Sequence, residues 1–200
     1  MPDADRIHAE FLLSAPSLKQ CPTPDRPEVA FAGRSNAGKS SVLNRITGNR
    51  RMAKVSKTPG RTQLLNFFDI KTGGRLVDLP GYGYAKATKN AQAQWQKSVN
   101  DYLARRDSLT GLILVTDIRH PGHAFDEEIM TWSEASELPI RILLNKADKL
   151  SKNKQHQALG LLQKKYSGHG YASFQCFSAL KSTGTNQLIE CLLGWLDESQ

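Results

Sequence analysis

The eight residues from Gly33 to Ser40 read Gly-Arg-Ser-Asn-Ala-Gly-Lys-Ser, a spacing that suits the binding of a polyphosphate. Gly33 and Gly38 let the backbone pass close to a β-phosphate, whose charge is met by N–H groups at the start of a helix. Lys39 can reach the β- and γ-phosphate oxygens, and the Ser40 hydroxyl is a hard oxygen ligand suited to Mg²⁺. An apolar run precedes the segment and a helical pattern follows it. We therefore predict a nucleoside triphosphate site here.

A second segment, Asp78-Leu-Pro-Gly81, ends an apolar run of strand length downstream of the phosphate loop. An aspartate at this edge of a sheet can hold Mg²⁺ through its water shell, and the Gly81 N–H can detect the γ-phosphate. The motif is short, and loop aspartates before a Pro-Gly turn are common. Its place in the order of motifs favours a role at the nucleotide.

The tetrad Asn145-Lys-Ala-Asp148 follows another apolar run and predicts the base. The Asp148 carboxylate can accept hydrogen bonds from N1–H and the N2 amino group of guanine, a donor pair that adenine lacks. The Lys146 stem can lie along the base, and Asn145 can tie this segment to the phosphate loop. Ser178-Ala-Leu180 can then offer a backbone N–H to guanine O6. Together these segments predict a GTP site.

The motifs must be positioned by apolar strands that alternate with amphipathic helices. Strands are predicted at residues 11–15, 29–32, 64–70, 76–79, 112–116, 140–144 and 173–177. Helices are predicted at residues 39–47, 92–106, 125–137, 154–165 and 185–196. Parallel strands joined by helical crossovers form an open sheet covered on both faces, and its ligands bind at the carboxyl ends of the strands. The fold class is therefore α/β, with residues 11–15 as an edge strand.

The charge of the chain is concentrated in one stretch. The 200 residues include 27 Lys and Arg against 19 Asp and Glu, which gives a net charge of +8. No acidic residue occurs from Val29 to Phe68, and the basic residues of that stretch account for the entire excess. Such a stretch favours a polyanionic partner.

The cysteines and the hydropathy of the sequence indicate the cellular compartment of the protein. Cys21, Cys176 and Cys191 are widely spaced and outside any paired ligand motif, which is typical of reduced cytoplasmic thiols. No apolar run approaches the ~18 residues of a membrane span, and the polar start of the sequence is unlike a signal peptide. We therefore expect a cytoplasmic protein without a membrane partner.

The ordered motifs G-R-S-N-A-G-K-S, T-P-G-R-T-Q, D-L-P-G-Y-G-Y, N-K-A-D and S-A-L resemble those of the TrmE-Era-EngA-EngB-like GTPases, and within them the EngB (YihA/YsxC) group. Residues 58–63 and 81–85, with Trp95 downstream, are specific to the group. The resemblance covers residues 25–200 as the G domain and leaves 1–24 as an N-terminal extension. It implies a three-layer, Ras-like P-loop NTPase fold, with a mostly parallel sheet and one antiparallel edge strand. It also implies GTP and Mg²⁺ binding, a role in assembly of the large ribosomal subunit, and a need for the protein in normal cell division and septation.

The resemblance also implies roles for single residues. The switch I threonine falls at Thr62, the expected second side-chain ligand of Mg²⁺ beside Ser40, with Thr58 as the alternative. Asp78 would hold the ion through water, and Lys39, Thr62 and Gly81 would act on the γ-phosphate. The residues expected to contact the nucleotide are Gly33, Arg34, Ser35, Asn36, Ala37, Gly38, Lys39, Ser40, Gly60, Arg61, Thr62, Gln63, Leu64, Asp78, Leu79, Pro80, Gly81, Asn145, Lys146, Ala147, Asp148, Phe177, Ser178, Ala179 and Leu180.

Two positions bear on hydrolysis. Tyr82 follows Gly81, where Ras-like enzymes carry a glutamine that orients the attacking water. A phenol cannot position water as a carboxamide does, so slow unaided turnover is expected. Asn36 occupies a position where an asparagine can coordinate K⁺ in related GTPases, and we hypothesise stimulation by K⁺. The alternative is that Asn36 only holds the loop conformation.

The basic residues in the loop after the first helix, which we call the basic loop, and in switch I predict a nucleic-acid partner. We expect rRNA to contact Arg50, Arg51, Lys54 and Lys57, because basic side chains bind RNA phosphates largely independently of the base sequence. The alternative is that these residues form a solvated surface without a partner. The favoured function is a monomeric GTPase that acts in assembly of the large ribosomal subunit and binds no DNA. The alternative is a GTP-gated binding module that acts on a division protein, with incidental hydrolysis. The guanine motif disfavours a third reading, an ATPase or small-molecule kinase.

Overall fold

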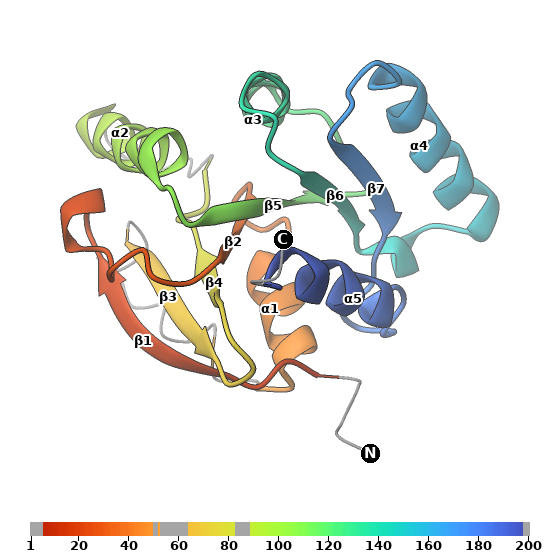
Figure 1. Cartoon of the computed structure of the whole chain (residues 1–200). Coiled ribbons are helices and arrows are strands. Elements are labelled where there is room, and N and C mark those ends of the chain that lie inside the picture. Colours follow the sequence, from red (N-terminus) through yellow and green to blue (C-terminus); the bar gives the residue numbers. More distant parts are fainter. Residues whose placement is uncertain (1–5, 50–51, 53–63, 83–88, 198–200) are drawn as a thin grey trace.

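Seven strands form one sheet in the order β1-β3-β4-β2-β5-β6-β7 (Figure 1). The computed structural model describes residues 6–49, 52, 64–82 and 89–197, of which 89–95 are described in their backbone alone. The strands are β1 (Ala9–Ala15), β2 (Glu28–Gly33), β3 (Leu65–Ile70), β4 (Arg75–Asp78), β5 (Leu109–Asp117), β6 (Ile140–Asn145) and β7 (Ala172–Cys176). Each predicted strand is therefore present, with ends that differ by a few residues.

Five neighbouring strands, from β4 to β7 in the sheet order, run parallel. The expected antiparallel strand is β3, which pairs in that sense with both β4 and β1. It lies second from the edge, because β1 covers its outer side. The short turn between β3 and β4 sets their antiparallel pairing, and Gly73 and Gly74 adopt φ angles of 110° and 78° in it.

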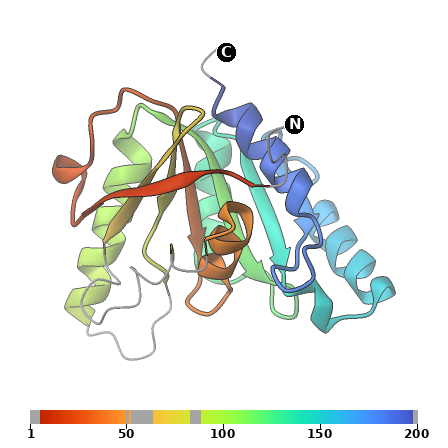
Figure 2. The same cartoon turned by 90° about the horizontal axis from the view of Figure 1, so that it is seen from below.

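Helices cover both faces of the sheet, and the three-layer α/β architecture is confirmed (Figures 1 and 2). One face carries α1 (Lys39–Thr47) and α5 (Thr185–Trp195), and the other carries α2 (Lys89–Arg105), α3 (Ala124–Ala135) and α4 (Lys152–Lys165). None of the helices in the described ranges is long and apolar enough to cross a membrane.

The central strand β5 shows why the apolar runs lack alternation. Ile113 and Val115 enter the core beneath α1 and α5, while Leu112 and Leu114 enter the core beneath α2 and α3. All four side chains are buried. A strand covered on both faces reads as a continuous apolar run, so this pattern predicts a sheet between two helical layers.

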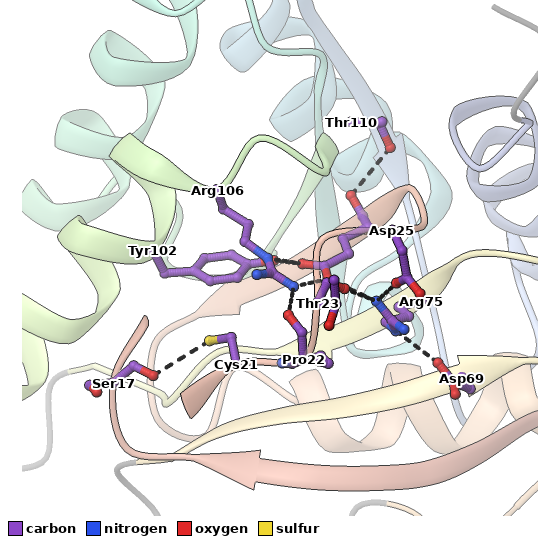
Figure 3. Close-up of polar contacts among 11 residues, drawn as sticks. Ser17, Cys21, Pro22, Thr23, Asp25, Asp69, Arg75, Tyr102, Arg106 and Thr110 are labelled. Atoms are coloured by element: carbon purple, nitrogen blue, oxygen red, sulfur yellow. Dashed lines mark hydrogen bonds and ion pairs between the residues drawn. The ribbon is translucent and has the colours of Figure 1, made fainter. Parts of the chain in front are cut away.

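A buried ion network ties the amino-terminal ends of β2 and β4 to the end of α2 (Figure 3). Glu28 is fully buried and accepts hydrogen bonds from Tyr102 Oη at 2.9 Å and from Arg106 Nε at 2.9 Å and Nη2 at 2.5 Å. Arg106 also donates to the Pro22 carbonyl. Burial and the Glu28 carboxylate raise the pKa of Tyr102. The phenol therefore stays a hydrogen-bond donor.

Arg75 joins this network from β4. It donates to Asp69 Oδ1 and to the Thr23 carbonyl, and it forms an ion pair with Asp25 at 2.8 Å. Its Nη1 also lies 3.7 Å from Glu28 Oε1. Two arginines from different elements thus converge on one buried carboxylate, and the segment before β2 is held against the sheet (Figure 3).

Candidate nucleotide site

The phosphate loop connects β2 to α1, as its sequence predicts. β2 ends at Gly33, and α1 begins at Lys39. A Cβ at Gly33 would lie 2.6 Å from the Val115 carbonyl oxygen, so a side chain there would clash with β5. Gly38 has a φ of 99°, and a Cβ there would collide with the Asn145 amide. Both glycines are therefore required by the packing of the loop as well as by the space that a phosphate needs.

The pairing of β2 and β4 brings the second motif to the phosphate loop. Phe31 is in register with Asp78, and the Leu79 N–H donates to the Phe31 carbonyl at 3.0 Å. The Ser35 N–H donates to the Tyr82 carbonyl at 2.7 Å. The Asp-Leu-Pro-Gly segment therefore runs along the loop, as the parallel sheet predicts.

A cavity of about 550 Å³ lies at this edge of the sheet. The expected contact residues that line it are Arg34, Ser35, Asn36, Gly38, Lys39, Ser40, Asp78, Leu79, Pro80, Gly81 and Lys146. Lys39 Nζ and the Asp78 carboxylate form an ion pair in which the side chains are 10% and 3% exposed. The cavity thus combines a nearly buried ammonium with the oxygen donors Ser40 and Asp78.

The base motif is joined to the phosphate loop by two side chains. Asn145 Nδ2 donates to the Ala37 carbonyl at 2.9 Å, and Lys146 Nζ donates to the Asn36 carbonyl at 2.6 Å. The predicted link through Asn145 is present. Asn145 Oδ1 is buried and has no hydrogen-bond partner in the described part of the chain. An unpaired buried acceptor costs free energy, so it is available to a ligand or to water.

Asp148 is oriented by the last of the predicted motifs. Ser178 Oγ, from a fully buried residue, donates to Asp148 Oδ1 at 2.6 Å, and this hydrogen bond lowers the pKa of the carboxyl. The Ala147 N–H donates to the carbonyl of Phe177, whose ring is buried in the core. Within the same motif, Leu180 is 72% exposed. The two segments thus present an ionised carboxylate in a fixed orientation.

The ion pair around Asp117 has no counterpart in the predicted site. Asp117 ends β5 in register with Asn145, and its Oδ2 lies 3.0 Å from Lys146 Nζ. Arg119 donates to both carboxylate oxygens, at 2.9 and 2.7 Å. The hydrogen bonds from Arg119 and Lys146 hold the pKa of Asp117 far below its usual range. Asp117 therefore stays charged and steadies the Lys146 ammonium; its place at the end of a strand was the available signal.

Tyr82 does not line the cavity. Its side chain is 6% exposed and packs on Phe125 with ring centroids 4.4 Å apart. The hydroxyl donates to Asp126 Oδ1, and burial together with this carboxylate raises the pKa of the phenol. Asp126 Oδ2 also accepts from the His123 N–H at the start of α3. The residue after Gly81 thus binds the first turn of α3, and its side chain is fixed in the core.

Some predicted residues cannot be placed. Gly60, Arg61, Thr62 and Gln63, the alternative Thr58, and the basic residues Arg50, Arg51, Lys54 and Lys57 lie outside the described residues. Leu64, the neighbour of β3, is half-buried. The roles expected of switch I and of the basic loop stay predictions.

Comparison with known proteins identifies the family of the chain. Residues 28–146 match the family of 50S ribosome-binding GTPases. The chain is 45% identical over 192 residues to the "Probable GTP-binding protein EngB" of Aeromonas salmonicida (strain A449), which covers 96% of this chain and 88% of that protein. The protein of the same name from Yersinia enterocolitica is 44% identical over 189 residues, covering 94% and 87%.

Solved structures share the fold. A crystal structure of a probable GTP-binding protein EngB superposes with a TM-score of 0.70 at 22% identity, covering 84% of this chain and 98% of that one. Era in complex with MgGDPNP and nucleotides of 16S ribosomal RNA superposes with a TM-score of 0.63 at 22% identity, covering 87% and 58%. From the family model and the close relatives, the chain belongs to the EngB group of GTP-binding proteins, a GTPase family.

Proposed function

We propose that this protein is a slow, Mg²⁺-dependent GTPase that acts in assembly of the large ribosomal subunit. The observation that carries the chemistry is the cavity in which the phosphate loop, Asp78–Gly81 and Lys146 meet, with Asp148 held ionised by Ser178. The polyphosphate would occupy the cavity, and the base would lie against Lys146 and Asp148. The unpaired Oδ1 of Asn145 beside the phosphate loop supports a ligand at this place.

The residues present fit a magnesium ion. Ser40 and Asp78 line the same cavity and are hard oxygen donors, which Mg²⁺ prefers. Ser40 and Thr62 would ligate it directly, and Asp78 would hold it through water. When bound, Mg²⁺ neutralises charge on the phosphate oxygens. Lys39 would turn from Asp78 to the β- and γ-phosphates, and the Gly81 N–H would donate to the γ-phosphate.

The burial of Tyr82 supports slow turnover. Its phenol is committed to Asp126, so this position supplies no side chain to orient the attacking water. Another group would then have to assist hydrolysis, and we propose K⁺ held by Asn36, which would add positive charge beside the phosphates. The φ of Asn36 is 67°, and its carbonyl is already bound by Lys146, which leaves the side-chain oxygen as the ligand.

GTP hydrolysis is expected to be faster in KCl than in NaCl at equal ionic strength. An Asn36→Gly variant is expected to lose the difference, because glycine accepts the positive φ without strain and removes the amide oxygen. Single-turnover phosphate release measures both. Equal rates in the two salts would contradict the role of K⁺.

An Asp117→Asn variant is expected to bind both GTP and GDP about tenfold more weakly, because Lys146 loses its carboxylate partner. Fluorescent-nucleotide titration measures the change. Arg119→Gln is the matched control: it removes the exposed partner of Asp117 and leaves the Lys146 pair in place. If the two variants bind nucleotide equally well, Asp117 does not position Lys146.

The cellular role rests on the family and on the charge. The family model is named for 50S ribosome-binding GTPases, and the acid-free stretch from Val29 to Phe68 suits RNA phosphates. We propose a cytoplasmic monomer whose residues 25–200 form the G domain. Contact of rRNA with Arg50, Arg51, Lys54 and Lys57 would make ribosome binding respond to the nucleotide, and the need in cell division and septation would follow from subunit assembly.

Sedimentation with purified large ribosomal subunits tests this role. The protein is expected to co-sediment in the presence of a non-hydrolysable GTP analogue and to be released with GDP. Substituting Arg50, Arg51 and Lys54 with Ala should weaken co-sedimentation more than GTP affinity. A protein that binds GTP but does not co-sediment in either state would favour the alternative, a GTP-gated module acting on a division protein.

A further inference from the structure

A second acid-free stretch lies in the carboxyl-terminal half of the chain. No Asp or Glu occurs between Asp148 and Glu190, a stretch that includes β7 and all of α4. Its basic residues, apart from histidine, are Lys149, Lys152, Lys154, Lys164, Lys165 and Lys181. Unlike the first stretch, about a third of which lies outside the described residues, this one is described throughout.

Three of these lysines stand at exposed positions of α4, and the ion pairs of the described residues include none of them. Gln155 and Leu162 are buried beneath the helix, while Lys152, Lys154 and Lys164 are exposed. Within the described ranges no carboxylate forms an ion pair with any of these three, whereas Lys165 pairs with Glu127 of α3. We call Lys152, Lys154 and Lys164, with the polar residues between them, the α4 face.

The position of two lysines is unfavourable for the helix itself. Lys152 and Lys154 lie in the first turn of α4, which contains no acidic residue. The positive end of the helix dipole lies there, so cations in this turn destabilise a helix. In α3, by contrast, Asp126 and Glu127 occupy the first turn. Helix stability therefore does not explain Lys152 and Lys154, whereas Lys164 lies in the last turn, where a cation favours the dipole. An external anion beside the first turn would offset the charge of Lys152 and Lys154.

The α4 face continues toward the base motif and ends at α3. Lys149 and Lys181 lie close enough to Asp148 to lower the pKa of its carboxyl further, in addition to the Ser178 hydrogen bond. On the other side, α3 carries several acids and no Lys or Arg. The basic surface thus has a boundary, because neighbouring helices on one face of the sheet carry opposite charges. A polyanion would be confined to the α4 side.

The surface suits phosphate oxygens better than lipid. Its outward positions include Asn153, His156 and Gln157, and the space beside Gly160 is open. Leu161 is the large exposed apolar side chain of this helix, at 64%. A helix that binds in a membrane interface needs a broad apolar face, whereas Leu159 and Leu162 pack toward the protein. Figure 1 places α4 at the margin of the molecule, beside the edge strand β7.

We propose that the α4 face is an RNA-binding surface that contacts the phosphate backbone whichever nucleotide is bound. The inference rests on the proposed function for the nature of the partner. It adds a second contact, on an element that contains neither the phosphate loop nor Asp78–Gly81. Binding through switch I would respond to GTP, while the α4 face would hold RNA in both states.

The test is a triple variant, Lys152→Gln, Lys154→Gln and Lys164→Gln. Glutamine retains a long polar side chain and a similar helix propensity, so the helix should form. Binding to a short RNA duplex is measured by fluorescence anisotropy at several KCl concentrations. The affinity is expected to fall at least about tenfold, and the slope of log K against log [KCl] by about two to three, because each phosphate contact contributes roughly one. The loss should be equal with GDP and with a GTP analogue.

A control triple variant, Lys19→Gln, Lys71→Gln and Lys97→Gln, removes the same charge from exposed lysines on other elements. Equal losses in the two triples would overturn the inference, because net charge alone would then explain binding. Binding of the wild-type protein to phosphatidylglycerol vesicles in place of the RNA duplex would overturn it as well. Loss of duplex binding only in the α4 triple, in a protein that does not sediment with large subunits, would support the inference and contradict the proposed function.

Discussion

An Asp148→Asn variant is expected to bind GTP on the order of a hundredfold more weakly, or worse, than the wild-type protein. The carboxylate accepts from the N1–H and N2 amino groups of guanine, and Ser178 fixes its orientation at 2.6 Å. An asparagine in this place offers one acceptor and one donor, so its NH₂ group would face a guanine donor. Two donors that face each other in a desolvated site lose both hydrogen bonds.

The same variant is expected to gain affinity for XTP. Xanthine replaces the N2 amino group with a carbonyl oxygen, which can accept from the asparagine NH₂ while N1–H donates to its oxygen. Competition titrations with GTP, XTP and ATP measure the change in preference. The wild-type protein should select GTP over ATP, which would exclude the ATPase and kinase interpretation.

Asp117→Asn is the matched control for this preference. It is the same chemical change, at the end of the neighbouring strand, in a residue that contacts Lys146. It should weaken GTP and XTP binding alike and leave their ratio unchanged. If Asp148→Asn also leaves the ratio unchanged, the base does not lie against Asp148.

Much of the nucleotide site could be predicted from the sequence, because each of its motifs is formed by residues that are close together in the chain. The phosphate loop needs only the end of one strand and the start of one helix, which lie at Gly33 and Lys39 as predicted. The parallel sheet then brings the ends of β4 and β6 to the same edge. Once the crossovers are predicted, Asp78 and Asn145 must lie near the loop, and both do.

Other features depend on pairings between distant residues and left no local pattern. The direction of the Tyr82 side chain is set by Phe125 and Asp126 of α3, and nothing around Tyr82 in the sequence indicates that contact. Asp117 similarly acquires its role from its register with Asn145. The basic surface of α4 is not evident from net charge, because outside residues 29–68 the acidic residues, including those of α3, offset its lysines in the total.

The network around Glu28 could not be predicted for the same reason, yet it holds several elements together. It lies at the end of the sheet opposite the nucleotide cavity and joins β2 to the last residues of α2 (Figure 3). α2 begins only a few residues after the Asp78–Gly81 motif. The network therefore fixes the far end of the helix that follows this motif, while the near end faces the nucleotide side.

A Glu28→Gln variant is expected to lose about 3–5 kcal/mol of its free energy of unfolding. The carboxylate is fully buried and takes three hydrogen bonds from Tyr102 and Arg106. The amide of glutamine can accept hydrogen bonds only through its oxygen, because its nitrogen is a donor. The Arg106 guanidinium, which is 5% exposed, is then left without its counter-charge. Urea unfolding followed by circular dichroism measures the loss.

Two comparisons separate the buried charge from other causes. Glu10→Gln breaks an exposed pair with Lys71 and should change the stability by less than about 1 kcal/mol. The double variant Glu28→Gln, Arg106→Met removes both members of the buried pair and should be more stable than Glu28→Gln alone, because the uncompensated guanidinium is gone. The single variant Arg106→Met completes the comparison. If the loss of stability in the double variant equals the sum of the losses in Glu28→Gln and Arg106→Met, Glu28 and Arg106 contribute independently. The network would then be a set of separate contacts, each of which stabilises the protein by itself.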